Sequence, residues 1–332
     1  MSEQPYPWDV LSGAQMWVPD GHAIRALDPP TIIEGMLRQG EVVTVIGGAK
    51  TNKTWFSMAM ACAVASGNQF IGKEVTQAPV CYLDFELKLN MFRKRLSIVA
   101  SSPPKSFDFQ CLRGKQRLPK IQELETLIIN NKYKLLVIDS LYCTSWVSEE
   151  NSNDHTSKDL RALQEIAETT DVAIVVVDHT AKGSGKDRAV VDAARGASAK
   201  AGFFDSMFLL RQKEKAPEGQ QQVTVDMVLR DWPSPKGTPI LNFDFSGYQL
   251  KIEVVGEAAK GDQNGYRQKI LDTLNDAKSA GVSYRELEDD FEIAESNARR
   301  ILNRMLKENL VEEFKKPGEH AQRKFFKLKE PL

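Results

Sequence analysis

The segment formed by residues 41–67 constrains the fold of this 332-residue chain more than any other stretch. It begins with residues 42–46, a short apolar and β-branched run that indicates a buried strand. A glycine pair and a short polar stretch follow, and from Trp55 onward an alanine-rich pattern predicts a helix. The segment therefore predicts a strand, a loop and a helix in succession, as in sheets that are covered by helices.

The loop of this segment reads G-x-x-x-x-N-K-T from Gly47 to Thr54, which matches the P-loop pattern G-x-x-x-x-G-K-[ST] with one departure. Backbone N–H groups at the start of a helix favour the negative charge of phosphates. Lys53 would contact the β- and γ-phosphates, and the Thr54 hydroxyl would bind Mg²⁺. Asn52 replaces the usual glycine, but asparagine tolerates a positive φ better than most residues. The alternative is an ordinary lysine-containing loop.

We therefore expect eight consecutive residues to bind ATP. They are Gly48, Ala49, Lys50, Thr51, Asn52, Lys53, Thr54 and Trp55. Lys53 is also expected to act in catalysis, because it would reach the phosphate that is transferred.

The composition excludes several classes of protein. The net charge is −1, so contacts with nucleic acid must come from local basic patches. No apolar run approaches the roughly 20 residues of a membrane helix, and the N-terminus lacks the pattern of a signal peptide. We expect a cytoplasmic protein without membrane contact, whose scattered thiols are reduced. These thiols belong to Cys62, Cys81, Cys111 and Cys143.

Strand and helix patterns alternate through the first two thirds of the chain. Strands are expected at residues 42–46, 80–85, 133–139, 172–177, 203–210 and 223–230, with a closing hairpin at 241–245 and 249–254. Helices are expected at residues 31–39, 87–100, 121–131 and 157–169 and after the P-loop. Apolar strands alternating with helices predict an α/β fold with a mostly parallel sheet, which the later strands extend in antiparallel fashion.

The chain divides into four parts by composition and pattern. Residues 1–30 form a non-periodic arm, and residues 31–255 form the α/β domain. Residues 256–264 are polar and glycine-containing, so they read as a linker. In residues 265–332 we expect helices at 266–276, 283–291 and from residue 295, and a hairpin at 311–314 and 324–328. Ser283 and Glu286 have the spacing of a capping box, and the whole predicts a winged helix.

Polar residues at three strand ends are candidates for catalysis, because ligands of open α/β sheets bind there. Asp139 occupies the usual place of the carboxylate that holds Mg²⁺ in P-loop enzymes, although a strand-end cap is the alternative. Glu86 could act as general base, or simply favour the dipole of the next helix; Asp84 is the reserve candidate. His179 could sense the γ-phosphate, or be a satisfied capping histidine. Asp178 precedes it.

P-loop enzymes often require an arginine that stabilises the developing charge. Arg230 is our first choice, and Arg195 and Arg211 also lie at strand or loop ends, although surface charge explains any one of them. Arg195 lies in the basic loop 180–195, which could contact phosphates or a neighbouring subunit, or be solvated.

The expected winged helix carries basic residues in its third helix and its wing, which suits contacts with DNA phosphates. Protein contacts are the alternative. The expected DNA-binding residues are Arg299, Arg300, Arg304, Lys315, Lys316 and Lys324, with Arg323 beside them.

The motifs GGAKTNKTW, LDFE, LLVIDS, VVVDHTAKG and AARGAS together resemble those of RecA-fold ATPases of the RepA type, the hexameric helicases of plasmids and mobile elements. The resemblance covers about residues 30–255 and implies a RecA-like P-loop NTPase that forms a ring around single-stranded DNA, with ATP between subunits. It implies that Glu86 is the catalytic base and Asp139 the Walker B acid. His179 matches the second member of the family's histidine pair, and Arg95 matches an arginine after the catalytic glutamate.

The segment around Arg230 is also similar to the arginine-finger region of DnaB-type replicative helicases. We therefore expect a DNA-dependent ATPase, an oligomeric and by resemblance hexameric helicase or translocase of a mobile element that uses ATP and Mg²⁺. Its partners would be single-stranded or duplex DNA. The alternatives are a nucleotide-switched DNA-binding protein, and a helicase-loading or recombination accessory protein with little hydrolysis.

Overall fold

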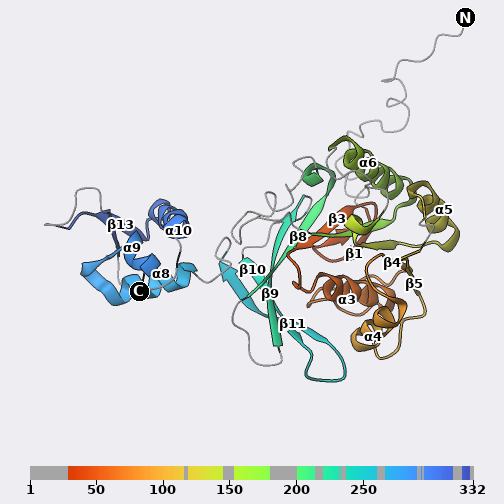
Figure 1. Cartoon of the computed structure of the whole chain (residues 1–332), viewed down its shortest axis with the longest axis horizontal. Helices are drawn as coiled ribbons and strands as arrows, with labels where there is room; N and C mark the ends of the chain where they lie inside the picture. Colours follow the sequence, from red (N-terminus) through yellow and green to blue (C-terminus); the bar gives the residue numbers. More distant parts are fainter. Residues whose placement is uncertain are drawn as a thin grey trace, which may run out of the picture.

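The computed structural model describes eleven stretches of the chain. They are residues 29–115, 119–144, 153–179, 200–213, 220–230, 232, 237–259, 266–289, 293, 295–316 and 324–329. Within them, a nine-stranded sheet forms the centre of the larger unit (Figure 1). The expected arm, residues 1–30, lies almost entirely outside the described residues.

The strand order of the large sheet is β11-β10-β9-β8-β3-β7-β6-β4-β5. The strands are β3 (Val42–Gly47), β4 (Val80–Asp84), β5 (Phe107–Cys111), β6 (Leu135–Asp139), β7 (Ala173–His179), β8 (Ser206–Gln212), β9 (Gln220–Leu229), β10 (Gly237–Asp244) and β11 (Lys251–Ala259). Strands β8, β3, β7, β6, β4 and β5 run parallel, and β9, β10 and β11 are antiparallel to their neighbours. The α/β fold with a mostly parallel sheet is confirmed.

Helices cover both faces of this sheet. On one face lie α3 (Lys53–Ser66) and α4 (Leu89–Val99), and on the other α5 (Ile121–Asn131) and α6 (Asn153–Thr170) (Figure 1). Each face has its own apolar core, one around Phe56 and Val175 and one around Leu124 and Ile174. Val175 and Ile174 are neighbours on β7 and serve opposite faces, which explains why the central strands are apolar throughout. Short 3-10 turns occupy Leu141–Cys143, Lys200–Phe203 and Lys278–Ala280.

Two expectations about the elements were wrong, and one strand was missed. Residues 31–39 form a small hairpin of β1 (Thr31–Ile33) and β2 (Leu37–Arg38) rather than a helix, because Gly35 turns the chain with φ 68° after a β-branched run. Strand β5 was missed, although its alternation of buried and exposed residues is the pattern of a half-buried strand. Strand β11 continues to Ala259, so residues 256–259 are not linker.

The C-terminal helices and hairpin are present where the sequence predicts them. The elements are α8 (Tyr266–Ala277), β12 (Val282–Ser283), α9 (Tyr284–Asp289), α10 (Glu295–Lys307), β13 (Val311–Phe314) and β14 (Phe325–Leu328). The strands pair antiparallel in the order β12-β14-β13 and enclose a core that contains Leu274, Leu302 and Phe326. The capping box is confirmed, since Ser283 N–H donates to Glu286 Oε2 at 2.6 Å and Glu286 N–H to Ser283 Oγ at 3.3 Å.

In the part of the chain that the structure describes, no helix is both long and apolar enough to span a bilayer.

Candidate functional site

The P-loop connects β3 to α3 through a tight turn. Two of its non-glycine residues have left-handed backbones, Lys50 with φ 64° and Asn52 with φ 65°. Thr51 Oγ1 donates to the Gly48 carbonyl at 3.0 Å. A Cβ atom at Gly47 would lie 2.5 Å from Thr51 Oγ1 and 2.6 Å from the Leu210 carbonyl, so only glycine fits there. The turn is therefore folded closely enough to present backbone N–H groups at the start of α3.

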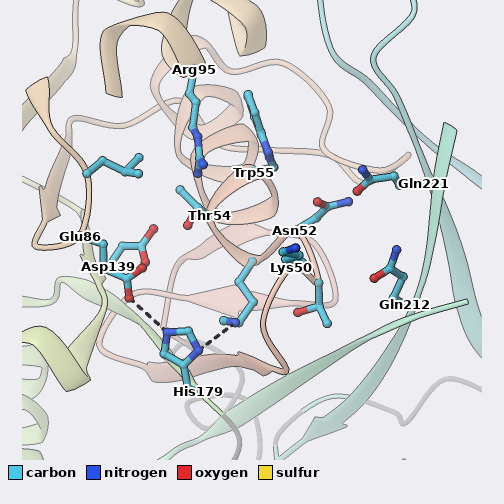
Figure 2. A pocket seen from close by; sticks show the side chains of 13 residues that line it. Lys50, Asn52, Thr54, Trp55, Glu86, Arg95, Asp139, His179, Gln212 and Gln221 are labelled. Atoms are coloured by element: carbon cyan, nitrogen blue, oxygen red, sulfur yellow. Dashed lines mark hydrogen bonds and ion pairs between the residues drawn. The ribbon is translucent and has the colours of Figure 1, made fainter. Parts of the chain in front are cut away.

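Lys53 is buried and its ammonium group points back to this turn. Its Nζ donates to the carbonyls of Gly47 at 3.0 Å and Gly48 at 2.9 Å, and lies 3.4 Å from His179 Nδ1 (Figure 2). Burial lowers the pKa of Lys53, and the carboxylates of Asp139 and Glu86 oppose that shift. Lys53 thus supplies a desolvated cation beside the loop.

The strand order brings the predicted acidic residues to this cation. β7 lies between β3 and β6, and β6 pairs with β4, so Asp139 lies beside Asp84 in register. Asp139 is buried, which raises its pKa, and it accepts a hydrogen bond from the Tyr82 hydroxyl at 2.7 Å, which opposes the rise. The Thr54 side chain also hydrogen-bonds Asp139. The two residues expected to hold Mg²⁺ therefore meet, although they come from different elements.

Glu86 follows β4 and reaches the same place. Its Oε1 accepts a hydrogen bond from the Ser140 hydroxyl and lies 3.2 Å from His179 Nε2. The His179 hydrogen bond is the main reason why the pKa of Glu86 falls to about 2, and Ser140 adds to it. The side chains of Glu86 and His179 are 32% and 41% exposed, so water can reach the carboxylate.

Asp84 has a different place from the one the sequence suggests. It is fully buried beneath the turn, and its Oδ1 accepts the backbone N–H groups of Glu86 at 3.0 Å and Leu87 at 2.5 Å. Burial raises its pKa to about 7, against the effect of these hydrogen bonds. Asp84 therefore positions the segment that carries Glu86 and is not itself exposed to a reacting water.

Most of these side chains, but not the buried Asp84 and Tyr82, line one cavity of about 430 Å³ (Figure 2). Its lining includes Lys50, Thr51, Asn52, Lys53, Thr54, Trp55, Glu86, Asp139 and His179. Of the eight residues expected to bind nucleotide, only Gly48 and Ala49 do not line it. Leu87, Gln212 and Gln221 also line the cavity but were not predicted from the sequence, and Arg95 was named only by resemblance. The available signal was only that both glutamines lie at or next to the ends of a polar segment between two expected strands, and their place beside the P-loop follows from the strand order.

The structure does not bring Arg230 to this cavity. β9 is antiparallel to β8, and its last residue, Leu229, pairs with Ser206 at the start of β8. Arg230 therefore lies at the end of the strands opposite to the P-loop, where its Nη1 donates to Asp205 Oδ1 at 2.9 Å. Arg211 faces Asp226 at 3.4 Å. Arg195 and the loop 180–195 lie outside the described residues.

Most of the expected DNA-binding residues of the C-terminal unit have partners within it. Ion pairs join Arg299 to Glu295, Arg304 to Glu308, and Lys324 to Glu313. Lys316 Nζ lies 4.0 Å from the ring centre of Phe325. Arg300 is exposed on α10 and Lys315 is exposed after β13, whereas Arg323 lies outside the described residues. These contacts lower the positive potential of the surface, because each acidic partner offsets one cation.

The oxygen donors of Thr54 and Asp139 fit Mg²⁺, which prefers hydroxyl, carboxylate and phosphate oxygens. Among the described residues, no three His, Cys, Asp or Glu side chains gather as a metal site of their own. A metal at Thr54 and Asp139 would therefore complete its coordination with ligand oxygens or water.

Comparison with known proteins finds similarity to a curated protein and to a solved structure. A DNA repair and recombination protein, RadB of Pyrococcus abyssi, is 28% identical over 167 residues, which are 47% of this chain and 64% of that protein. The chain thus matches less than two thirds of its relative's length. The crystal structure of a KaiC-like protein of Pyrococcus horikoshii OT3 is 16% identical and covers 68% of this chain and 94% of its own, with a TM-score of 0.48.

A family model described as "AAA domain" matches residues 14–185, which are more than half of the chain. The matched range contains the P-loop, Glu86, Asp139 and His179. The chain belongs to this AAA domain family and has the α/β fold of a RecA-like P-loop NTPase.

Proposed function

We propose that this chain is an ATPase that hydrolyses ATP with Mg²⁺ in the cavity of the P-loop. The observation that carries this proposal is the convergence of Lys53, Thr54, Glu86 and Asp139, which come from three separate parts of the chain, on one cavity. A cation, a metal-binding hydroxyl and carboxylate, and a water-accessible base are the groups that phosphoryl transfer to water requires.

The P-loop supports a triphosphate in two further ways. Helix α3 has no acidic residue in its first turn, so nothing there opposes the attraction of its dipole for an anion. Asn52 Nδ2 is buried without a hydrogen-bond partner, and an orphaned buried donor of this kind is costly. A phosphate oxygen in the turn would accept that hydrogen bond. Asn52 therefore supports phosphate binding and does not merely replace a glycine.

The chain's own residues divide the chemistry between them. Mg²⁺, when bound by Thr54 and Asp139, would supply positive charge against the phosphate oxygens. Lys53 neutralises charge on the same phosphates. Glu86 remains ionised, because its pKa is about 2, and can accept a proton from water that enters beside it. His179 and Ser140 hold the Glu86 carboxylate in place.

We further propose that the ATPase is DNA-dependent and works as an oligomeric helicase or translocase of a mobile element, hexameric by resemblance. The support is the motif set, together with the name of its relative RadB as a DNA repair and recombination protein. The order of helices and strands in residues 266–328 supports a winged-helix domain that contacts DNA. This domain would start near residue 265, after a linker.

A second candidate is a nucleotide-switched DNA-binding or loading protein with little hydrolysis. The tight hold of His179 and Ser140 on Glu86 favours it, because a carboxylate with a pKa of about 2 is a weak base. In this case ATP would act by stabilising one conformation, and its turnover would be slow.

An ATPase assay of the purified chain, with and without single-stranded DNA, tests the proposal. Wild type is expected to release phosphate, Lys53→Ala to lose nucleotide binding or turnover, and Glu86→Gln to bind ATP without hydrolysing it. Glu168→Gln is the matched control, since Glu168 is exposed on α6, on the other face of the sheet. Wild type that binds ATP without hydrolysis in either condition supports the second candidate. Wild type that binds no ATP contradicts both.

A further inference from the structure

One side of the cavity has no part in the chemistry described above. Glu86 and His179 lie on one side of the P-loop, and Gln212 and Gln221 lie on the other, beyond Lys50 (Figure 2). Lys53 and Thr54 would hold the phosphates and metal near Glu86. A nucleoside triphosphate bound with its γ-phosphate at Glu86 must direct its remaining atoms away from that end, and Gln212 and Gln221 line the space there.

The strand register explains why the two glutamines act together. Gln212 pairs with Val223 across the antiparallel β8–β9 ladder, and Gln221 lies two residues before Val223 on the same strand. Residues two apart on a strand share a face, so both carboxamides lie on the face that carries the buried Leu210 and Val223. Diagonal neighbours of this kind are about 7–8 Å apart. Gln212 and Gln221 therefore lie on the face of the sheet that packs against α3, past the apolar core and at the end of the sheet where the P-loop lies.

The cavity also has an aromatic and cationic layer. Trp55, in the first turn of α3, packs edge-on against Phe245 with 5.2 Å between ring centroids. The guanidinium carbon of Arg95 lies 5.1 Å from the centre of the Trp55 ring, and both side chains line the cavity. A guanidinium plane and an indole offer flat surfaces to a nucleobase, whereas a carboxamide offers one acceptor and two donors to the base edge.

We infer that Gln212 and Gln221 bind the hydrogen-bonding edge of the nucleobase and so make this end of the cavity a base-recognition subsite. The inference rests on the proposed function, since it places a nucleotide in the cavity. Neither glutamine contacts the reacting atoms. Their role is to make a whole nucleotide bind more tightly than its triphosphate group would bind alone.

Binding of two probes separates the base from the phosphates. The probes are a non-hydrolysable ATP analogue and inorganic tripolyphosphate, each with Mg²⁺, titrated calorimetrically into the full chain. The variants are Gln212→Ala, Gln221→Ala and the double variant. Gln222→Ala is the matched control, because Gln222 alternates to the opposite face of β9, where it pairs with Asn242. Thermal unfolding checks that each variant is folded.

Each glutamine variant is expected to bind the ATP analogue about five-fold more weakly, the effect of one neutral hydrogen bond, and the double variant about 25-fold more weakly. Tripolyphosphate affinity is expected to stay unchanged, and Gln222→Ala to match wild type for both probes. The inference is overturned if the variants lose affinity for both probes equally, if they lose none, or if wild type binds both probes equally tightly. Wild type that binds neither probe overturns the proposed function, and the subsite with it.

Discussion

Asn52 is expected to lower the stability of the nucleotide-free protein. Its backbone is left-handed, with φ 65° and ψ 21°, and its Nδ2 is buried without a partner. An unpaired buried donor costs about 1–3 kcal/mol, and the left-handed backbone costs roughly 1 kcal/mol more. Asn52→Gly removes both costs. The greater flexibility of glycine also stabilises the unfolded state, which offsets up to about 1 kcal/mol of this gain. The removed costs total about 2–4 kcal/mol, so after subtracting about 1 kcal/mol the variant should gain roughly 1–3 kcal/mol of unfolding free energy, or on the order of 5 °C in Tm for a domain of this size.

The same substitution is expected to weaken nucleotide binding. A hydrogen bond from Asn52 to a phosphate would be worth about 1.5–3 kcal/mol, because its acceptor is charged. Asn52→Gly should therefore bind a Mg²⁺–ATP analogue roughly tenfold or more weakly, with a smaller rise in Tm on binding. Scanning calorimetry of the free and bound protein measures the stability, and isothermal titration measures the affinity.

Asn52→Ala separates the two effects. It also lacks the donor, so its nucleotide affinity should fall as in the glycine variant, but its Cβ keeps the backbone strained, so it should be roughly 1 kcal/mol less stable than Asn52→Gly. The reasoning is refuted if Asn52→Gly is no more stable than wild type without nucleotide, or if it binds the nucleotide more tightly.

Three further predictions follow from the contacts of single residues. His179→Ala removes the main hydrogen bond that holds the pKa of Glu86 near 2, so this pKa should rise toward its ordinary value of 4.5. At pH values below about 5 the kcat/KM of this variant should then decrease, whereas the kcat/KM of wild type should stay constant there. An unchanged pH profile contradicts the role of His179. Arg230→Ala should keep ATP turnover within about twofold of wild type. It should lower the free energy of unfolding by less than ~1 kcal/mol, because the side chains of its ion pair, Arg230 and Asp205, are 53% and 21% exposed. A hundredfold loss of turnover would instead place Arg230 in the site of a neighbouring subunit. Arg300→Ala should reduce the slope of log DNA affinity against log salt by about one, measured by fluorescence anisotropy, and an unchanged slope would favour a protein partner.

Much of the fold could be predicted because its signals are local. The apolar run of β3, the P-loop and α3 follow one another within a single stretch, and periodicity alone identified α5 to its last residue. The hairpin of β1 and β2 and the edge strand β5 were not recognised. Both are short, and a strand of a few residues contains too few repeats of its pattern to outweigh the helix propensity or loop residues around it.

The candidate site could be predicted in part for the same reason. Asp139 and His179 are the last residues of strands, and Glu86 and the P-loop residues Lys53 and Thr54 come shortly after strands. In a parallel sheet the carboxyl ends of the strands lie at the same end of the sheet. Their direct contacts, such as that between Glu86 and His179, depend on the order of the strands. That order is invisible to local patterns, because strands far apart in sequence become neighbours only in the folded sheet.

By itself the amino-acid sequence determined that this chain has a P-loop on an α/β fold with acidic groups at its strand ends, since these features depend on neighbours along the chain. Only the tertiary structure decided which side chains share the cavity. The reversal of direction between β8 and β9 carries Arg230 to the opposite end of the strands and brings Gln221 beside the P-loop. Strand direction is set by long-range pairing in the sheet, and no local pattern records it.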